Sequence, residues 1–439
     1  MNENKTPLDN GKVSKSQGCL ALSPMLVFLL LYVAVSAFIG DFYKIPISVA
    51  LLAASMWAII IYKGKNLKER IETFSSAAAK SDILYMIWIF ILAGAFASVA
   101  KAIGAVDATV SFTLMVFPSE YIVPTLFVAS CFISFSIGTS VGTVVALTPL
   151  AAELASSGDA NVPFFVAAVL GGAFFGDNIS FISDTTIAAT RSQGCNMQDK
   201  FRVNLWIALP AAIATLACYV FLTHGVPEIL APDEQDPWLM LPYLVVIVTA
   251  VVGVNVTLVL TAGIGCAVIL GILNGVDVFD LASFMGEGIE SMGSLIIITL
   301  LASGMLGVIK ESGGIQFILQ GLSQRISGLR GAQAVLALLV GIVNLCTANN
   351  TVAIITVGSL SRDISRRFGV DPRKSASILD SASCVVQCLI PYGAQTLLAT
   401  SLADISPAAP FPYLYYPWAL AITLTLSIIF LFPRRYSSR

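Results

Sequence analysis

The chain has 439 residues, of which 57% are hydrophobic and 11% charged, and its formal net charge is −2. A soluble domain carries about 25% charged residues, so this composition excludes a water-soluble protein and predicts an all-α polytopic membrane protein. No basic run indicates nucleic-acid binding. The eight cysteines fall mostly in apolar segments and form no metal-ligand pattern, so we expect buried thiols rather than disulfides or a metal site.

Apolar segments recur along the whole chain. One helical crossing of a bilayer needs about 20 apolar residues. The sequence predicts about 12 to 14 transmembrane helices, with about 14 as the best count. They lie near residues 22–39, 45–62, 83–100, 120–137, 143–157, 163–190, 203–224, 238–254, 256–273, 292–309, 333–347, 351–366, 375–400 and 413–432.

Lysine and arginine residues predict the orientation, because they are enriched in cytoplasmic loops. With about 14 spans, nearly all of them fall on one side, the exceptions being Lys44 and Lys101. We therefore expect both termini and the loops at 63–80 and 362–374 to be cytoplasmic in a cell (inner) membrane. The acidic segment at 277–290 is then external.

Two parts of the chain resemble each other at an offset of about 209 residues (310 − 101): residues 91–106 match 300–315 around Lys101 and Lys310. The interrupted span at 163–190 maps in the same way onto 375–400. Each copy contains about seven spans, so the second must enter the membrane from the opposite side. The sequence thus predicts two inverted-topology repeats with paired broken helices, which are typical of secondary transporters. The expected divisions are a first repeat at 1–224, an external linker at 225–237 and a second repeat at 238–439.

The first interrupted span changes from an apolar, glycine-rich half to a polar half within a few residues. Its candidate ion-binding residues are Asp177, Asn178, Ser180, Ser183, Asp184, Thr185 and Thr186. Polar residues at membrane depth must face protein or a water-filled cavity, and hard cations bind several oxygen ligands. We expect Asp177 and Asp184 to bind Na+ or H+. The alternative is that both carboxylates are solvated at a cytoplasmic helix end near Arg191.

The second copy offers matching polar residues. Pro391 and Gly393 are helix breakers in the middle of the span at 375–400. The candidates in this span and in the preceding turn are Asp380, Ser383, Gln387, Tyr392, Gln395, Thr347, Asn349, Asn350 and Thr351. We expect Asp380 to be a third Na+ ligand near Asp177 and Asp184, unless it is a helix-end carboxylate paired with Arg373 or Lys374. The neutral polar residues would also suit an organic substrate.

The run Gly176-Asp177-Asn178-Ile-Ser180-Phe-Ile-Ser183-Asp184-Thr185-Thr186, followed by Ala-Ala-Thr190, resembles the signature of the NhaC-type Na+/H+ antiporter family. The sequence differs at Phe181, where many members carry proline. The resemblance implies membership of an ion-transporter group with inverted repeats, and a cation-coupled antiport activity. Some members exchange malate for lactate, and others carry amino acids.

The sequence therefore favours a secondary active Na+/H+ antiporter in which buried carboxylates bind Na+ or H+ competitively under alternating access. The alternative is a Na+- or H+-coupled transporter or exchanger of a small organic acid or amino acid. A membrane enzyme is disfavoured, because the sequence has no nucleophile motif or phosphate-binding loop. We expect no cofactor. Expected partners are the lipid bilayer and small ions or a small organic solute, with no nucleic acid, and a homodimer stays open.

Overall fold

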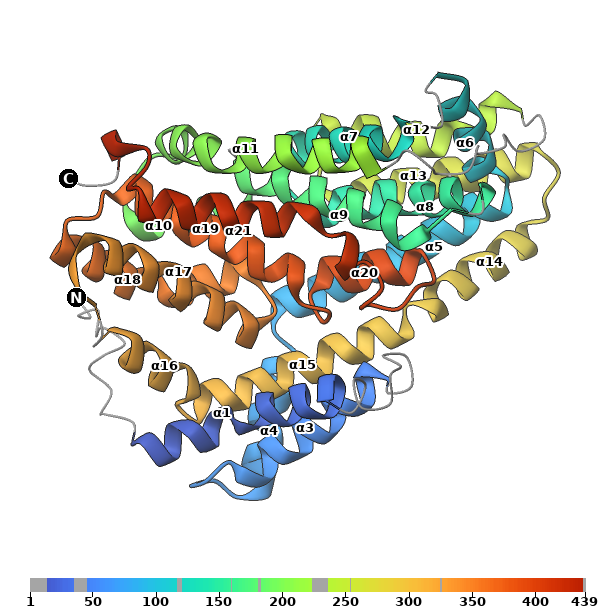
Figure 1. Ribbon diagram of the computed structural model, residues 1–439. Helices are drawn as coiled ribbons and strands as arrows, with labels where there is room; N and C mark the ends of the chain where they lie inside the picture. Colours follow the sequence, from blue (N-terminus) through green and yellow to red (C-terminus); the bar gives the residue numbers. More distant parts are fainter. Residues whose placement is uncertain are drawn as a thin grey trace.

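The computed structural model describes residues 14–34, 46–116, 121–158, 160–180, 183–222, 236–252, 254–323 and 326–436. Throughout these ranges the regular structure is helical, and the helices pack side by side (Figure 1). Nine helices in the described part of the chain are long and apolar enough to cross a membrane. Four shorter helices are also apolar. The expected all-α polytopic membrane protein is confirmed.

The helices fall into two series along the chain. The first series is α1 (Lys15–Leu29) with the π-helix η1 (Leu30–Ala34), α3 (Ile47–Ile61), α4 (Leu67–Ala78), α5 (Ser81–Ala102), α6 (Ala105–Val116), α7 (Ile122–Ile137), α8 (Ser140–Ser157), α9 (Val162–Ile179), α10 (Asp184–Gln193) and α11 (Met197–Leu222). The second series is η3 (Pro237–Met240), α12 (Leu241–Val251), α13 (Val256–Leu273), α14 (Val278–Ser291), α15 (Gly293–Glu311), α16 (Gly314–Ser323), α17 (Gly328–Thr347), α18 (Asn350–Phe368), α19 (Pro372–Leu389), α20 (Ala394–Leu402), η4 (Phe411–Tyr413), α21 (Tyr415–Ile429) and η5 (Arg434–Tyr436).

Segments that hydropathy assigned to loops contain helices. Helix α4 fills most of the predicted loop at 63–80, and the side of the membrane that this segment faces stays a prediction. Asn66 caps this helix and forms a reciprocal capping box with Glu69. Helix α14 likewise occupies the acidic segment at 277–290, and the basic segment that starts at 362 begins inside α18. Helices α4 and α14 carry too many polar residues for hydropathy to recognise them as spans, so only their caps and amphipathic pattern could have revealed them.

Helices that the expected repeat pairs with each other make reciprocal contacts between the two series. Helix α4 packs against α15, and its counterpart α14 packs against α5. Similarly, α10 packs against α18, and α20 packs against α8. At the crossing of α5 and α14, Gly94 and Gly288 approach so closely that a Cβ on either would meet the carbonyl oxygen of the other. The opposite orientation of the two halves in a membrane stays a prediction, as do the repeat boundaries. Residues 225–235 of the expected linker lie outside the described part.

Candidate functional site

Two interrupted spans cross the interior of the protein. In the first, α9 ends at Ile179 and α10 begins at Asp184, with extended backbone at Ser180 and Ser183. Phe181, where the sequence departs from the family signature, lies outside the described residues. In the second, α19 ends at Leu389 and α20 begins after Gly393. Because a helix interruption leaves backbone groups unpaired, each break needs polar partners nearby.

Asp177 lies in the last turn of α9 and is buried, with 5% of its surface exposed. Its carboxylate oxygen Oδ2 accepts a hydrogen bond from Ser140 Oγ at 3.1 Å. Ser140 is the first residue of α8, directly after the interruption between α7 and α8. The interior position of Asp177 argues against its assignment as a solvated helix-end carboxylate.

A chain of hydrogen bonds continues from Ser140 into the second half of the protein. Gln395 Nε2 donates to Ser140 Oγ at 3.1 Å, and Gln387 Nε2 donates to Gln395 Oε1 at 3.0 Å. Gln387 Nε2 also donates to the carbonyl oxygen of Ala348 at 3.0 Å. Ala348 has left-handed backbone (φ 49°) at the turn between α17 and α18. The structure thus brings these polar segments together, since hydrogen bonds connect Asp177 to both interruptions of the second half.

Asp380 lies in α19 and forms an ion pair with Lys200 of α11, and neither side chain is exposed. Lys200 Nζ also donates to Thr186 Oγ1 at 2.7 Å and to the carbonyl oxygen of Asn178 at 2.5 Å. Thr186 Oγ1 lies 3.5 Å from Asp380 Oδ2. Lys200 thus donates a hydrogen bond to backbone at the first break, and it also pairs with the buried Asp380 carboxylate on α19.

The alternative pairing of Asp380 with Arg373 or Lys374 is wrong. Arg373 pairs with Asp371 at 2.7 Å. Lys374 is fully buried, and its ammonium group donates to Ser427 Oγ and, at 2.7 Å, to the carbonyl oxygen of Phe432. Asp380 points instead into the protein interior toward α11.

Amide and hydroxyl groups surround Asn178 next to this ion pair. Asn204 Nδ2 donates to Asn178 Oδ1 at 2.6 Å and to the carbonyl oxygen of Asn178 at 2.7 Å. Asn204 Oδ1 in turn accepts from Ser377 Oγ at 2.6 Å and from Ser381 Oγ at 2.9 Å. This network joins α9, α11 and α19, so it holds the first break against the helix that carries Asp380.

The remaining candidates of the first break lie at the start of α10. Ser183 caps this helix and accepts from the Thr186 backbone N–H at 3.2 Å, and its hydroxyl lies 3.1 Å from Thr185 Oγ1. Asp184 is exposed, unlike Asp177. Asp177 nevertheless lies within electrostatic range of Asp184, Asp380 and Lys200. In the described ranges, no three His, Cys, Asp or Glu side chains form a group that could hold a metal ion.

The turn between α17 and α18 is fixed mainly by its own residues. Asn349 Oδ1 accepts from the Val352 N–H at 3.0 Å, and Thr347 Oγ1 donates to the Asn349 carbonyl oxygen at 3.1 Å. Asn350 Oδ1 accepts from the Thr351 N–H at 3.1 Å. These residues therefore shape the turn that presents the Ala348 carbonyl oxygen to Gln387.

Two further candidates support this turn from α19 and from the second break. Tyr392 OH donates to the Leu345 carbonyl oxygen at 2.8 Å. Ser383 Oγ donates to the Asp380 carbonyl oxygen at 2.9 Å, and the Ser383 carbonyl oxygen accepts from Asn344 Nδ2 at 2.8 Å. The side chains of Tyr392 and Ser383 therefore hydrogen-bond to backbone carbonyl oxygens in this part of the protein.

The sequence prediction omitted Lys200, Asn204 and Ser140 from the site. The distribution of basic residues along the chain places Lys200 with Arg191 and Arg202 in a cytoplasmic basic group. The missed signal is helical periodicity: Lys200 and Asn204 are one turn apart, and the buried residues Val203 and Ile207 continue the same face. A lysine on the buried face of a membrane helix is costly unless it is paired, so it indicates a functional partner.

Comparison with known proteins identifies the family. The profile of the Na+/H+ antiporter family matches residues 19–224 and 235–433. The chain is 23% identical over 425 residues to the Na(+)/H(+) antiporter NhaC of Bacillus subtilis, covering 88% of this chain and 91% of the relative. It is 20% identical to the malate-2H(+)/Na(+)-lactate antiporter of the same species, covering 93% and 94%. It is 23% identical to the arginine/ornithine antiporter ArcD of Halobacterium salinarum, covering 74% and 75%. The chain therefore belongs to the Na+/H+ antiporter family, and it is a multi-pass membrane protein that works as a secondary transporter.

Proposed function

We propose that this transporter exchanges Na+ for H+, and that Asp177 is the carboxylate that binds them in turn. One observation carries the proposal. The buried carboxylates among the described residues are Asp177, Asp371 and Asp380. Asp371 and Asp380 each pair with a basic side chain, whereas no ion pair involves Asp177 in the part of the chain that the structure describes.

An isolated carboxylate ion in the interior is expensive, so Asp177 needs either a proton or a cation. Na+ binds oxygen ligands as other hard cations do, and the Ser140 hydroxyl already lies against the carboxylate. Because one carboxylate cannot hold both a proton and a Na+, the two ions compete. The empty, charged form would resist passage through the membrane interior by at least about 2.5 kcal/mol. Alternating access with either ion bound then yields exchange.

The other two carboxylates have different parts in this proposal. Asp380 remains paired with Lys200, and this pair holds α11 against α19 while its opposite charges sit beside the Asp177 site. Asp184 is exposed at the start of α10, where its charge would raise the local concentration of cations. Asp380, which the sequence predicts as a third Na+ ligand, is thus one half of a neutral ion pair in this proposal. The carboxylate whose charge changes during transport is Asp177.

Proteoliposome flux tests the proposal. The protein is reconstituted with an internal pH dye, and proton movement is measured after addition of Na+, Li+ or K+. Asp177→Asn should abolish Na+-dependent proton movement, and Asp177→Glu should retain part of it. Asp363→Asn is the matched control, because Asp363 is an exposed carboxylate on α18. Unchanged exchange and Na+ affinity in Asp177→Asn would contradict the assignment.

A second candidate function is exchange of a small organic acid or amino acid. It is favoured by buried polar atoms that lack a hydrogen-bond partner among the described residues, namely Asn350 Nδ2 and Gln387 Oε1. Both adjoin the turns near Asp177, where they could bind a polar solute. The malate/lactate and arginine/ornithine antiporters among the relatives support keeping it. A panel of organic anions and amino acids in the same flux assay separates the two functions, because only solute exchange would depend on an organic counter-substrate.

A further inference from the structure

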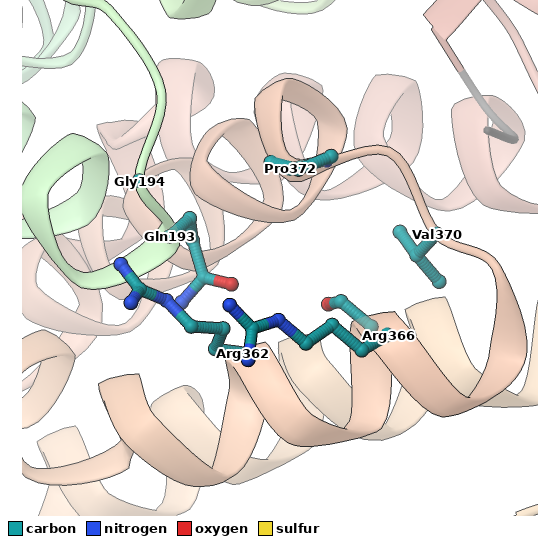
Figure 2. Close-up of a pocket in the computed structure, with 7 residues that line it drawn as sticks. Gln193, Gly194, Arg362, Arg366, Val370 and Pro372 are labelled. Carbon is teal, nitrogen blue, oxygen red and sulfur yellow. The ribbon is translucent and has the colours of Figure 1, made fainter.

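A polar pocket lies where α10 of the first half meets α18 and α19 of the second, and neither Asp177 nor Asp380 lines it. Its lining residues are Gln193, Gly194, Arg362, Ser365, Arg366, Val370 and Pro372. Figure 2 shows the side chains of Arg362 and Arg366 rising from one helix toward Gln193 on the facing segment. The cavity volume is about 130 Å³.

The pocket carries two positive charges and no negative one. Arg362 and Arg366 are one turn apart on α18, and like charges at this spacing repel each other. Neither arginine forms an ion pair with any acidic side chain in the described ranges. One Nη atom of Arg362 donates to the Arg191 carbonyl oxygen at 3.0 Å, whereas its Nε is buried without a partner among these residues.

The polar neighbours of the two arginines are already satisfied. Gln193 Nε2 donates to the Gly358 carbonyl oxygen at 3.0 Å, and Gln193 Oε1 accepts from Ser375 Oγ at 2.9 Å. Ser365 Oγ donates to the Ser361 carbonyl oxygen at 2.7 Å. The wall of the pocket is therefore fixed by its own hydrogen bonds, and the guanidinium groups are the donors left for a ligand.

We propose that this pocket binds a phosphate group, held by Arg362 and Arg366. Guanidinium groups bind phosphate oxygens through paired, charge-assisted hydrogen bonds, and an anion here would remove the repulsion between the two arginines. The group belongs either to an anionic lipid or to free inorganic phosphate. Basic pockets between membrane helices on the cytoplasmic side are suited to lipid headgroups, and the expected topology places the end of α18 on that side.

The test is thermal unfolding of the full-length protein, purified in detergent and delipidated. It is titrated separately with cardiolipin, phosphatidylcholine and inorganic phosphate at matched ionic strength. We expect the unfolding midpoint to rise with cardiolipin or with phosphate, and not with phosphatidylcholine. A rise with cardiolipin alone identifies a lipid headgroup, and a rise with both identifies a general phosphate site.

Three variants test the residues. Arg366→Gln should raise the half-saturating concentration by about tenfold, which corresponds to one lost charge-assisted hydrogen bond. It is expected to fold normally, because Arg366 is exposed. The double variant Arg362→Gln/Arg366→Gln should remove the response. Arg367→Gln is the matched control, since Arg367 is exposed on the same helix but does not line the pocket. The proposal is overturned if neither cardiolipin nor inorganic phosphate raises the unfolding midpoint, or if Arg366→Gln responds as the unaltered protein does.

Discussion

Lys200 and Asp380 form an ion pair that is fully buried and joins the two halves of the chain. Lys200 belongs to α11 in the first half, and Asp380 belongs to α19 in the second. The lysine also reaches the carbonyl oxygen of Asn178, next to Asp177. Lys200 therefore neutralises Asp380, one of the two neighbouring buried carboxylates, and Asp177, the other, is the proposed binding site of the transported ion.

Lys200→Met should destabilise the protein strongly. It leaves the Asp380 carboxylate buried without its counter-ion, and breaking a buried pair in this way costs about 3–5 kcal/mol. We expect a large fall in the thermal-unfolding midpoint of the purified protein. Adding Asp380→Asn should recover much of this loss, because the unpaired charge is then gone. A double variant as unstable as Lys200→Met alone would show that the lysine acts by packing rather than by pairing.

Lys374→Met is the matched control for this prediction. Lys374 is equally buried, but its described partners are the Ser427 hydroxyl and the Phe432 carbonyl oxygen rather than a carboxylate. The Ser427 hydroxyl also donates to the Phe432 carbonyl oxygen, which therefore keeps a donor in the variant. We expect a much smaller change in the unfolding midpoint than for Lys200→Met.

The sequence revealed the polar breaks because polar residues are conspicuous in an apolar chain. Asp177 and Asp380 could both be predicted in this way, and the repeat further predicted their approach. The periodicity of α11 indicates that Lys200 lies on a buried face, but its pairing with Asp380 depends on the packing of α11 against α19, which no local pattern contains. Its position near a helix end resembles that of the other basic residues that set topology. The sequence left open whether Asp184 is buried or solvated, because the exact break between α9 and α10 decides which side chains face inward.

Gly172→Ala should impair folding, because α7 and α9 approach too closely to admit a methyl group. A Cβ at Gly172 would lie 2.5 Å from the Phe127 carbonyl oxygen and 2.5 Å from Ser130 Cβ. Gly265→Ala is the control, since a Cβ there meets nothing within 4 Å and alanine favours the helix by roughly 0.5–1 kcal/mol. The yield of monodisperse protein after membrane extraction measures the effect of each substitution on folding. Equal yields for the two variants would contradict the close packing of α7 on α9.

The expected topology predicts that Arg367 faces the cytoplasm, as do both termini. Arg367 is exposed near the end of α18, and the neighbouring Arg366 and Arg373 make this end strongly basic. In a background without the eight native cysteines, Arg367→Cys should resist a membrane-impermeant maleimide in intact cells and react after the membrane is opened. Labelling in intact cells would show that the second half has the opposite orientation to the one expected.

The proposed competition at Asp177 predicts how Na+ transport depends on pH. Na+ binds only the deprotonated carboxylate, so the apparent KM for Na+ equals the intrinsic value divided by the deprotonated fraction. As pH falls, that fraction falls, and the apparent KM should rise by up to about tenfold per pH unit once most sites are protonated. The maximal rate at saturating Na+ should change much less on the side where Na+ binds, because Na+ displaces the proton. Proteoliposome flux at a series of external pH values, with the internal pH held constant, measures both quantities. An apparent KM that stays constant while the maximal rate falls would show that Na+ and H+ bind different groups, and Asp177 would then not be the shared site.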